Sequence, residues 1–302
     1  MITTGAPSTE PSPRAHGPWR QAAARFRRRP LGIAAVLLLL AFVVVALLVP
    51  RIAPYSGAQL FFEYLNDPQP PSLHGGHLLG TDVIGHDMLT QLLWAIRESV
   101  LGGLGCAAGA TLIGLVVGAV AGYAGGVVDA LLEWVVSAVV TIPALVVLVL
   151  VVVYTAPVPL WAFPVTLALY LWTYVARAVR ASFVALRARE FVEAAQAAGA
   201  SAVRIVFRHL LPNTPGAVLV AATSIVGQSI VIIATADFFG FGNQQSDRPT
   251  LGGLVALATK GTPTGYAPWW LYVIPAVALG LLLVSVNFAA DTLDDVLEPV
   301  RG

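Results

Sequence analysis

The chain has little charge for its length, and this scarcity indicates the solvent in which it folds. Of its 302 residues, 11% are charged and 57% are hydrophobic, whereas a soluble domain carries about 25% charged residues. The formal net charge is +1, so no strong electrostatic field is available for binding nucleic acid. The composition therefore predicts an integral membrane protein whose surroundings are a lipid bilayer.

Cysteine and lysine are almost absent, and each absence excludes a class of site. Cys106 is the single cysteine, which excludes a disulfide framework and a zinc cluster. Lys260 is the single lysine and precedes Gly261, whereas a P-loop requires lysine followed by serine or threonine. Neither G-x-S-x-G nor H-E-x-x-H occurs. We therefore predict a non-enzymatic chain without catalytic residues, a metal site or a cofactor of its own.

Six apolar stretches are long enough to cross a bilayer, which takes about 20 helical residues. The first has 19 residues, more than the about 7–15 of a signal-peptide core, so we interpret it as a retained anchor. The fourth is short, and we expect it to continue past Arg177. The stretches lie at 31–49, 99–122, 134–155, 160–177, 215–237 and 269–290, and the connections between them at 51–97, 123–133, 178–213 and 238–268.

Arginine is distributed unevenly between the two sides of the predicted membrane. With the N-terminus inside, 13 of the 17 basic residues lie on the cytoplasmic side, as the positive-inside rule requires. Both termini are therefore predicted to be cytoplasmic. The expected organisation is a disordered tail (1–24), the first helix with an extracytoplasmic segment (25–98), a transmembrane core (99–296) and a short C-terminus (297–302).

Ionisable side chains are missing from the interiors of the predicted spans. Asp129, Glu133, Arg177, Asp237 and Asp291 lie at or beyond span ends. Ion-coupled transporters bury carboxylates or histidines at membrane depth. The absence favours a passive conduit that takes its energy from another protein.

A glycine stripe in the second span predicts close helix packing. Gly114, Gly118, Gly122 and Gly126 are four residues apart and so share one helix face. Small side chains on such a face let another helix backbone approach closely. We expect this span to be a central element of the bundle.

A polar stripe in the fifth span is the candidate translocation path. Ser224, Gln228 and Thr235 fall within roughly 40° around a helix that turns about 100° per residue. Such a stripe faces either a neighbouring helix, as hydrogen-bonding glue, or a water-filled path. The two alternatives have similar support, and we predict the path.

The pattern of residues 188–213 predicts two short helices. The first runs from about Ala188 to Ala198, with acidic residues early, and Gly199 is suited to stopping it. Ser201 can cap the second, which carries an apolar stripe of Val203, Val206, Phe207 and Leu210. Such a hairpin must bury its apolar side chains against either the membrane surface or a partner protein.

The spacing in this segment resembles the "EAA" loop of bacterial ABC-importer permeases. The matching residues are Glu193-Ala194-Ala195, Gly199 and Leu211-Pro212, with His209 as in the peptide-importer branch. The resemblance implies a type I importer permease, all-α with six transmembrane helices, in the bacterial cytoplasmic membrane. It also implies that Glu193, Ala194, Ala195, Gly199, Leu211 and Pro212 couple the chain to an ATPase.

Further matches point to the dipeptide, oligopeptide and nickel branch and to its C-type subunit. The implied partners are a second homologous permease, two ATP-binding subunits or one fused ATPase that bind ATP and Mg²⁺, and an extracytoplasmic binding protein. Nickel or another small solute remains an alternative to peptides. The matching segments are Leu79–Asp82, Gly85–Asp87, Gly122–Gly126 with Asp129, Phe238–Gly242, Ala267–Trp270 and Asp291–Pro299.

Two readings from other classes stay open. A membrane enzyme would need polar groups such as Glu133, His86 and Asp87 together, and an assembly protein would need no EAA spacing.

Asp82 and Asp87 can also simply cap a helix that starts near Met88. We expect His86, which replaces the arginine of the family, to be an exposed surface histidine rather than a metal ligand, because no second ligand stands at a useful spacing.

Overall fold

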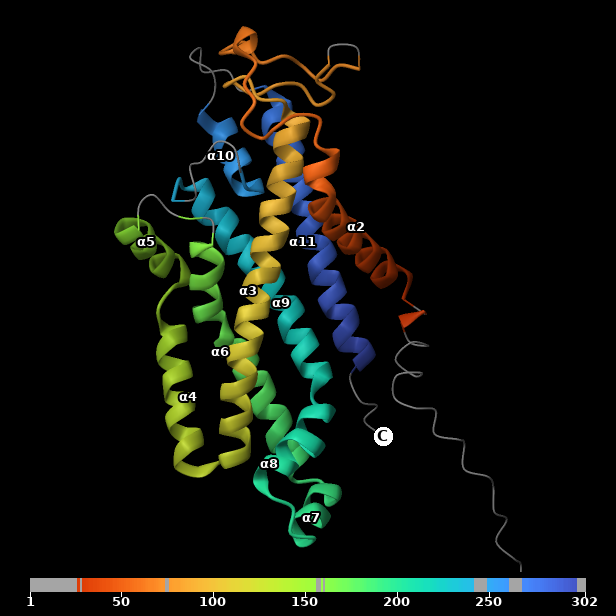
Figure 1. Cartoon of the computed structure of the whole chain (residues 1–302), viewed down its shortest axis with the longest axis vertical. Coiled ribbons are helices and arrows are strands. Elements are labelled where there is room, and N and C mark those ends of the chain that lie inside the picture. Colours follow the sequence, from red (N-terminus) through yellow and green to blue (C-terminus); the bar gives the residue numbers. More distant parts are fainter. Residues whose placement is uncertain are drawn as a thin grey trace, which may run out of the picture.

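The computed structural model describes residues 26–297 apart from 28, 74–75, 156–158, 160, 242–248 and 261–267. The predicted tail, 1–24, lies outside the described residues. The described chain is an elongated bundle of helices that run roughly along one axis (Figure 1). The helices are α2 (Pro30–Ile52), α3 (Met88–Ala124), α4 (Gly126–Thr141), α5 (Ala144–Thr155), α6 (Ala162–Arg187), α7 (Glu190–Ala197), α8 (Ala202–Ile205), α9 (Pro215–Phe238), α10 (Leu251–Lys260) and α11 (Trp269–Leu297).

The all-helical membrane architecture is confirmed. Five helices, α2, α3, α6, α9 and α11, are long and apolar enough to cross a membrane, and α4 with α5 makes a sixth candidate span that is bent by 73°. The fourth predicted span does continue past Arg177, since α6 ends at Arg187. Part of the connection 178–213 is therefore membrane helix rather than loop.

Two predicted boundaries in the middle of the chain were wrong. The expected turn at 123–133 is reduced to Gly125, because Gly125 and Gly126 have φ of 66° and 55° and reverse the chain within two residues. The span predicted at 134–155 is bent between α4 and α5, because Pro143 provides no N–H to continue the helix. The connections 51–97 and 238–268 also contain helix, namely the start of α3 and all of α10.

The α3–α6 contact is built on the predicted glycine face. A Cβ on Gly114 would lie 2.6 Å from the carbonyl oxygen of Trp172, and one on Gly118 would lie 2.5 Å from that of Ala176. Gly122 meets α6 in the same way, whereas a Cβ on Gly126 would have no neighbour within 4 Å. Three of the four predicted glycines therefore pack two helix backbones together, and the fourth belongs to the turn.

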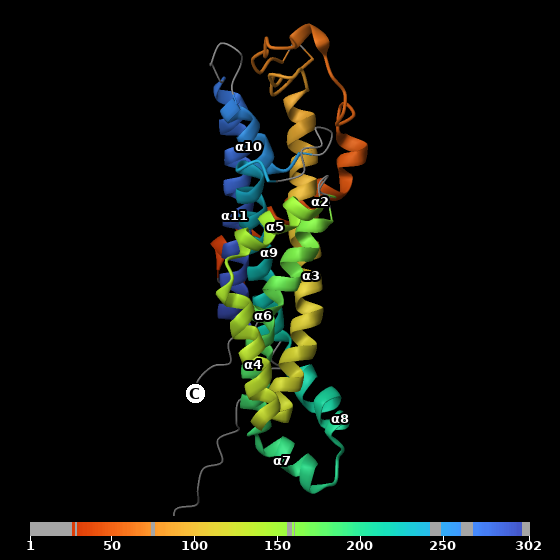
Figure 2. The ribbon, with the colours of Figure 1, turned by 90° about the vertical axis from the view of Figure 1, so that its left-hand side faces the viewer.

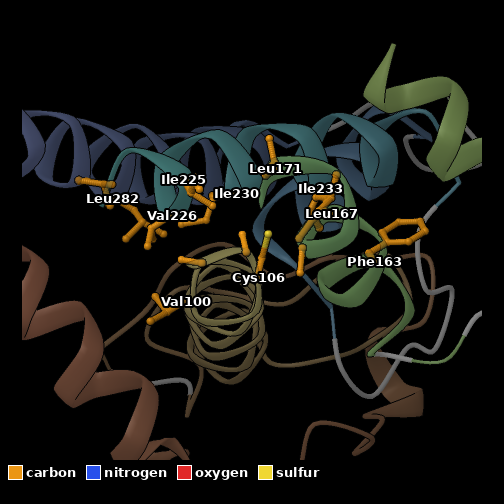
Figure 3. Packing of buried hydrophobic residues seen from close by; sticks show 14 of the residues in the cluster. Val100, Cys106, Phe163, Leu167, Leu171, Ile225, Val226, Ile230, Ile233 and Leu282 are labelled. Carbon is orange, nitrogen blue, oxygen red and sulfur yellow. The ribbon is translucent and has the colours of Figure 1, made fainter. Parts of the chain in front are cut away.

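The core surrounds α3. Figure 3 shows Val100 and Cys106 of α3 facing side chains of α6, α9 and α11. Cys106, Leu171, Ile225 and Leu282 are fully buried or nearly so. This shared cluster makes α3 the central helix that the glycine stripe predicted.

Two carboxylates, those of Asp82 and Asp87, bind histidine side chains and so hold together the segment between α2 and α3. Asp87 caps α3, accepting a hydrogen bond from Thr90 N at 2.8 Å, as one of the alternatives expected. His77 Nδ1 lies 2.9 Å from Asp87 Oδ1, and His86 Nδ1 lies 2.9 Å from Asp82 Oδ2. His86 is 3% exposed, so the expectation of a surface histidine was wrong. The segment folds over the ring, and the carboxylate of Asp82 pairs with its Nδ1.

Candidate functional site

The segment between α6 and α9 projects from one end of the bundle. Figures 1 and 2 show α7 at the tip, beyond the ends of α3 and α4, and α8 beside those ends. Ala188 and Arg189 alone separate α6 from α7. At the other end, Thr214 alone separates the 3₁₀ turn Leu211–Asn213 from α9, so the segment is joined closely to two membrane helices, α6 and α9.

Gly199 ends α7 as the sequence predicted. Gly199 N donates to Gln196 O at 2.9 Å, and Ala200 N donates to Ala195 O at 3.0 Å, the paired bonds of a Schellman motif. The motif needs a left-handed residue, and Gly199 has φ of 77°. A Cβ there would meet nothing within 4 Å, so glycine is required by backbone conformation and not by space.

The second half of the hairpin is capped at both ends. Ser201 Oγ accepts from Arg204 N at 3.4 Å, which confirms the predicted N-cap. After α8 the chain forms a π-helical turn, Val206–Leu210, and a 3₁₀ turn that contains Pro212. The side chain of Asn213 donates to His209 O at 2.6 Å, which satisfies a carbonyl near the point where the proline ends the helix.

Three apolar side chains anchor the segment and three others face outward. Val192, Ile205 and Leu210 are at most 1% exposed and belong to the main core. The outward-facing residues, which we name the coupling patch, are exposed by 42%, 66% and 65%: Phe191, Val203 and Phe207. The predicted apolar stripe is thus divided between the core and an uncovered surface.

The predicted coupling residues lie on the same segment. Glu193, Ala194, Gly199 and Pro212 are exposed, whereas Ala195 and Leu211 are half-buried. Leu211 packs against the core cluster, so four of the six are open on the surface of the segment. Sequence reasoning singled out Phe207 only as part of a stripe and missed Phe191, whose ring lies 6.3 Å from that of His209 between ring centroids. The sequence signal that could have identified Phe191 is a phenylalanine next to acidic residues on a short amphipathic helix.

The predicted path residues lie half-buried along α9. Ser224 Oγ donates to Val220 O at 3.0 Å, and Thr235 Oγ1 donates to Val231 O at 2.7 Å. Their hydroxyls are therefore already paired within the helix. Gln228 has no hydrogen-bonding partner among the described residues. The three lie on one side of α9.

A family profile for binding-protein-dependent transport system inner membrane components matches residues 114–301. The chain belongs to this family. A second profile, the N-terminal transmembrane domain of oligopeptide transport permease C, matches residues 17–71.

Curated relatives place the chain in the peptide branch of the family. It is 36% identical over 276 residues to the oligopeptide transport system permease protein OppC of Mycobacterium tuberculosis, covering 91% of this chain and 92% of that protein. It is 32% identical over 282 residues to the dipeptide transport system permease protein DppC of Bacillus subtilis, covering 93% and 84%. The chain is therefore an OppC/DppC-type permease, a non-catalytic, multi-pass membrane component of an ABC transporter.

A solved structure shares the fold. A chain of the MetNI methionine ABC transporter, in an inward-facing conformation, superposes with a TM-score of 0.57 at 21% identity and covers 70% of this chain and 98% of that one. This likeness confirms the importer-permease fold predicted from the sequence.

Proposed function

We propose that this chain is the C-type permease subunit of a bacterial importer of dipeptides or oligopeptides, and that residues 188–213 dock on its ATPase. The carrying observation is the coupling patch: two phenylalanines and a valine exposed on a segment that projects from the bundle. Large apolar side chains exposed on a projecting segment favour a contact with a protein or a membrane. The EAA spacing favours a protein, because a membrane-surface helix needs no such motif.

The proposal assigns distinct work to the predicted residues. Phe191 and Phe207 enter an apolar cleft of the ATPase. Glu193, exposed near the start of α7, contacts polar groups at its rim, and Gly199 fixes the angle between α7 and α8. ATP and Mg²⁺ bind to the partner, because this chain has no P-loop lysine.

The remaining partners follow from family membership. We propose a second, homologous permease, two ATP-binding subunits or one fused ATPase, and an extracytoplasmic binding protein that delivers the solute. Relatives named for oligopeptide and dipeptide transport support peptides over nickel. Ser224, Gln228 and Thr235 are the proposed contacts along the path.

Phe207→Asp tests the docking. A buried aromatic residue at the centre of an interface contributes about 2 kcal/mol or more, which corresponds to roughly thirtyfold in affinity. We expect the variant to reach the membrane and to lose the ATPase on co-purification. Phe62→Asp is the matched control, since Phe62 is 75% exposed in the segment between α2 and α3.

Gly199→Leu and Glu193→Lys extend the test from docking to coupling. The first forces a side chain into a left-handed conformation, and the second reverses a charge at the rim. Both should lose transport while the chain remains in the membrane. Normal ATPase recovery with Phe207→Asp, or wild-type transport by Gly199→Leu, would contradict the proposal.

A further inference from the structure

Four charged side chains join α4 to α6. Arg180 bonds Asp129 through two guanidinium nitrogens, with Nη2 donating to Oδ2 at 2.7 Å. Arg177 Nε donates to Glu133 Oε1 at 3.0 Å, and its Nη2 donates to Ser137 Oγ at 3.1 Å. The three α4 residues are four apart, so they share one face of that helix. We name these five residues the charge ladder.

Apolar packing alone holds α4 weakly. Val136 is the only buried residue of α4, a helix that the structure describes throughout. Val127, Leu131 and Trp134 are 85%, 60% and 68% exposed. Figure 2 shows α4 on the outside of the bundle, beside α6. The ladder therefore supplies the polar attachment of α4 to α6, beside the turn at Gly125 that joins α4 to α3.

The ladder lies on the surface of the bundle. Arg177 stands ten residues, about 15 Å at 1.5 Å per residue, before the end of α6. The side chains of Arg177 and Glu133 are 45% and 35% exposed, and those of Arg180 and Asp129 are 36% and 19% exposed. The bidentate contact of Arg180 adds directional geometry. A displacement of α6 that preserves these pairs must carry α4 with it.

The helix that carries the arginines is one of the two that are connected to residues 188–213, the proposed coupling loop; the other is α9. α6 ends two residues before α7 and packs on α3 through the glycine contacts. A displacement of α7 that reaches α6 therefore also reaches α3. α4 lies outside that pair, whereas α5 packs on the core directly through the buried Leu148.

We infer that the charge ladder makes α4 follow α6 when the coupling loop moves, so that Arg177 and Arg180 are positioning residues for transport. This inference rests on the proposed docking of residues 188–213. The ion pairs would thus hold α4 to α6 in the way that close packing holds α3 to α6. Transport then depends on the pairing across the ladder and not on the identity of either side chain.

The test uses the complete transporter reconstituted in liposomes, with labelled alanine peptides of two to five residues as the probe. Arg180→Asp and Asp129→Arg each place like charges together, and the double variant restores the pair in reverse. We expect each single variant to retain ATP hydrolysis and to lower peptide uptake per ATP about tenfold, a common size for coupling between sites. The double variant should recover most of the wild-type ratio. Arg51→Asp, an equal charge reversal at the exposed end of α2, should leave the ratio unchanged.

Each outcome bears on the inference. An unchanged uptake per ATP in both single variants, or no recovery in the double variant, would overturn it. If Arg180→Asp does not assemble, Arg180→Lys decides, because lysine keeps the charge without the bidentate fork: a lowered ratio supports the ladder and a wild-type ratio refutes it. Failure of the docking proposal is distinct, because it appears as normal ATPase recovery with Phe207→Asp.

Discussion

Replacing Arg97 by methionine should expose a gap in the hydrogen bonding of α2. Pro50 lies inside α2 and has no N–H, so the carbonyl oxygen of Ala46, four residues earlier, receives no bond from position 50. Arg97 Nη1, from α3, donates to that oxygen at 2.6 Å, and Ala46 is fully buried. The guanidinium therefore replaces the missing N–H and fastens α2 to α3, in the way neighbouring helices satisfy groups freed by membrane prolines.

The magnitude follows from the charge of the donor. A hydrogen bond to a charged group contributes about 1.5–3 kcal/mol, and Arg97→Met leaves the carbonyl unpaired. We expect the free energy of unfolding to fall by about 2 kcal/mol. Pro50→Ala supplies an N–H to the same oxygen. In that background Arg97→Met should cost less than about 1 kcal/mol, a non-additivity that a double-mutant cycle measures.

The assay is equilibrium unfolding in mixed detergent micelles, followed by tryptophan fluorescence. The four proteins of the cycle are compared with Arg51→Met, which removes an exposed arginine beside Pro50 and should have little effect. Equal costs of Arg97→Met in the two backgrounds would refute the reasoning, because Arg97 would then not compensate for the proline.

Three further predictions concern packing, path and topology. Gly118→Ala should destabilise the fold by about 1–3 kcal/mol, because its Cβ would meet the Ala176 carbonyl oxygen at 2.5 Å. Gly105→Ala, whose Cβ would have nothing within 4 Å, should not destabilise it. Equal thermal stability of the two variants would contradict the contribution of the glycine contact to the fold. Cysteines at Ser224, Gln228 and Thr235, in a Cys106→Ala background, should react with a water-soluble thiol reagent in a nucleotide-dependent way. A cysteine at Leu219, a position 45% exposed on the opposite side of α9 at about 100° per residue, should not react, and equal reaction there would identify the stripe as packing. A cysteine at Ser72 should react with an impermeant reagent added outside the cell and one at Ser201 should not, and the opposite result would reverse the orientation.

Hydropathy predicted the spans, but it could not predict where each helix turns. The run 134–155 is uniformly apolar, so its length suggested one helix. The bend depends on a single residue, Pro143, which removes one donor from an otherwise continuous pattern. Similarly, Gly125 and Gly126 reverse the chain without any polar loop, and hydropathy does not register a backbone conformation.

The candidate site was predicted where it is local and missed where it is tertiary. Gly199 and Ser201 act on neighbours within five residues, so their types and spacing were enough to place the Schellman motif and the cap. The exposure of Phe191 and Phe207 depends on which side of the hairpin α6 covers. The burial of His86 likewise depends on the fold of the whole segment before α3, and no pattern around position 86 encodes it.

Helix attachments in this bundle differ in kind, and the difference bears on how movement passes through it. The glycine contacts of α3 and α6 bring backbones together, so neither helix can slide without opening a void or a clash. α2 packs on α11, where a Cβ on Gly32 would lie 2.3 Å from Thr292 Oγ1, and adds polar contacts near its ends, Arg97 with Ala46 and the ion pair of Arg29 with Asp295. α4 is joined to α6 by the charge ladder. Residues 188–213 connect α6 to α9, so the closely packed pair of α3 and α6 lies at one end of the proposed coupling segment, and the ladder lies where α4 meets that pair.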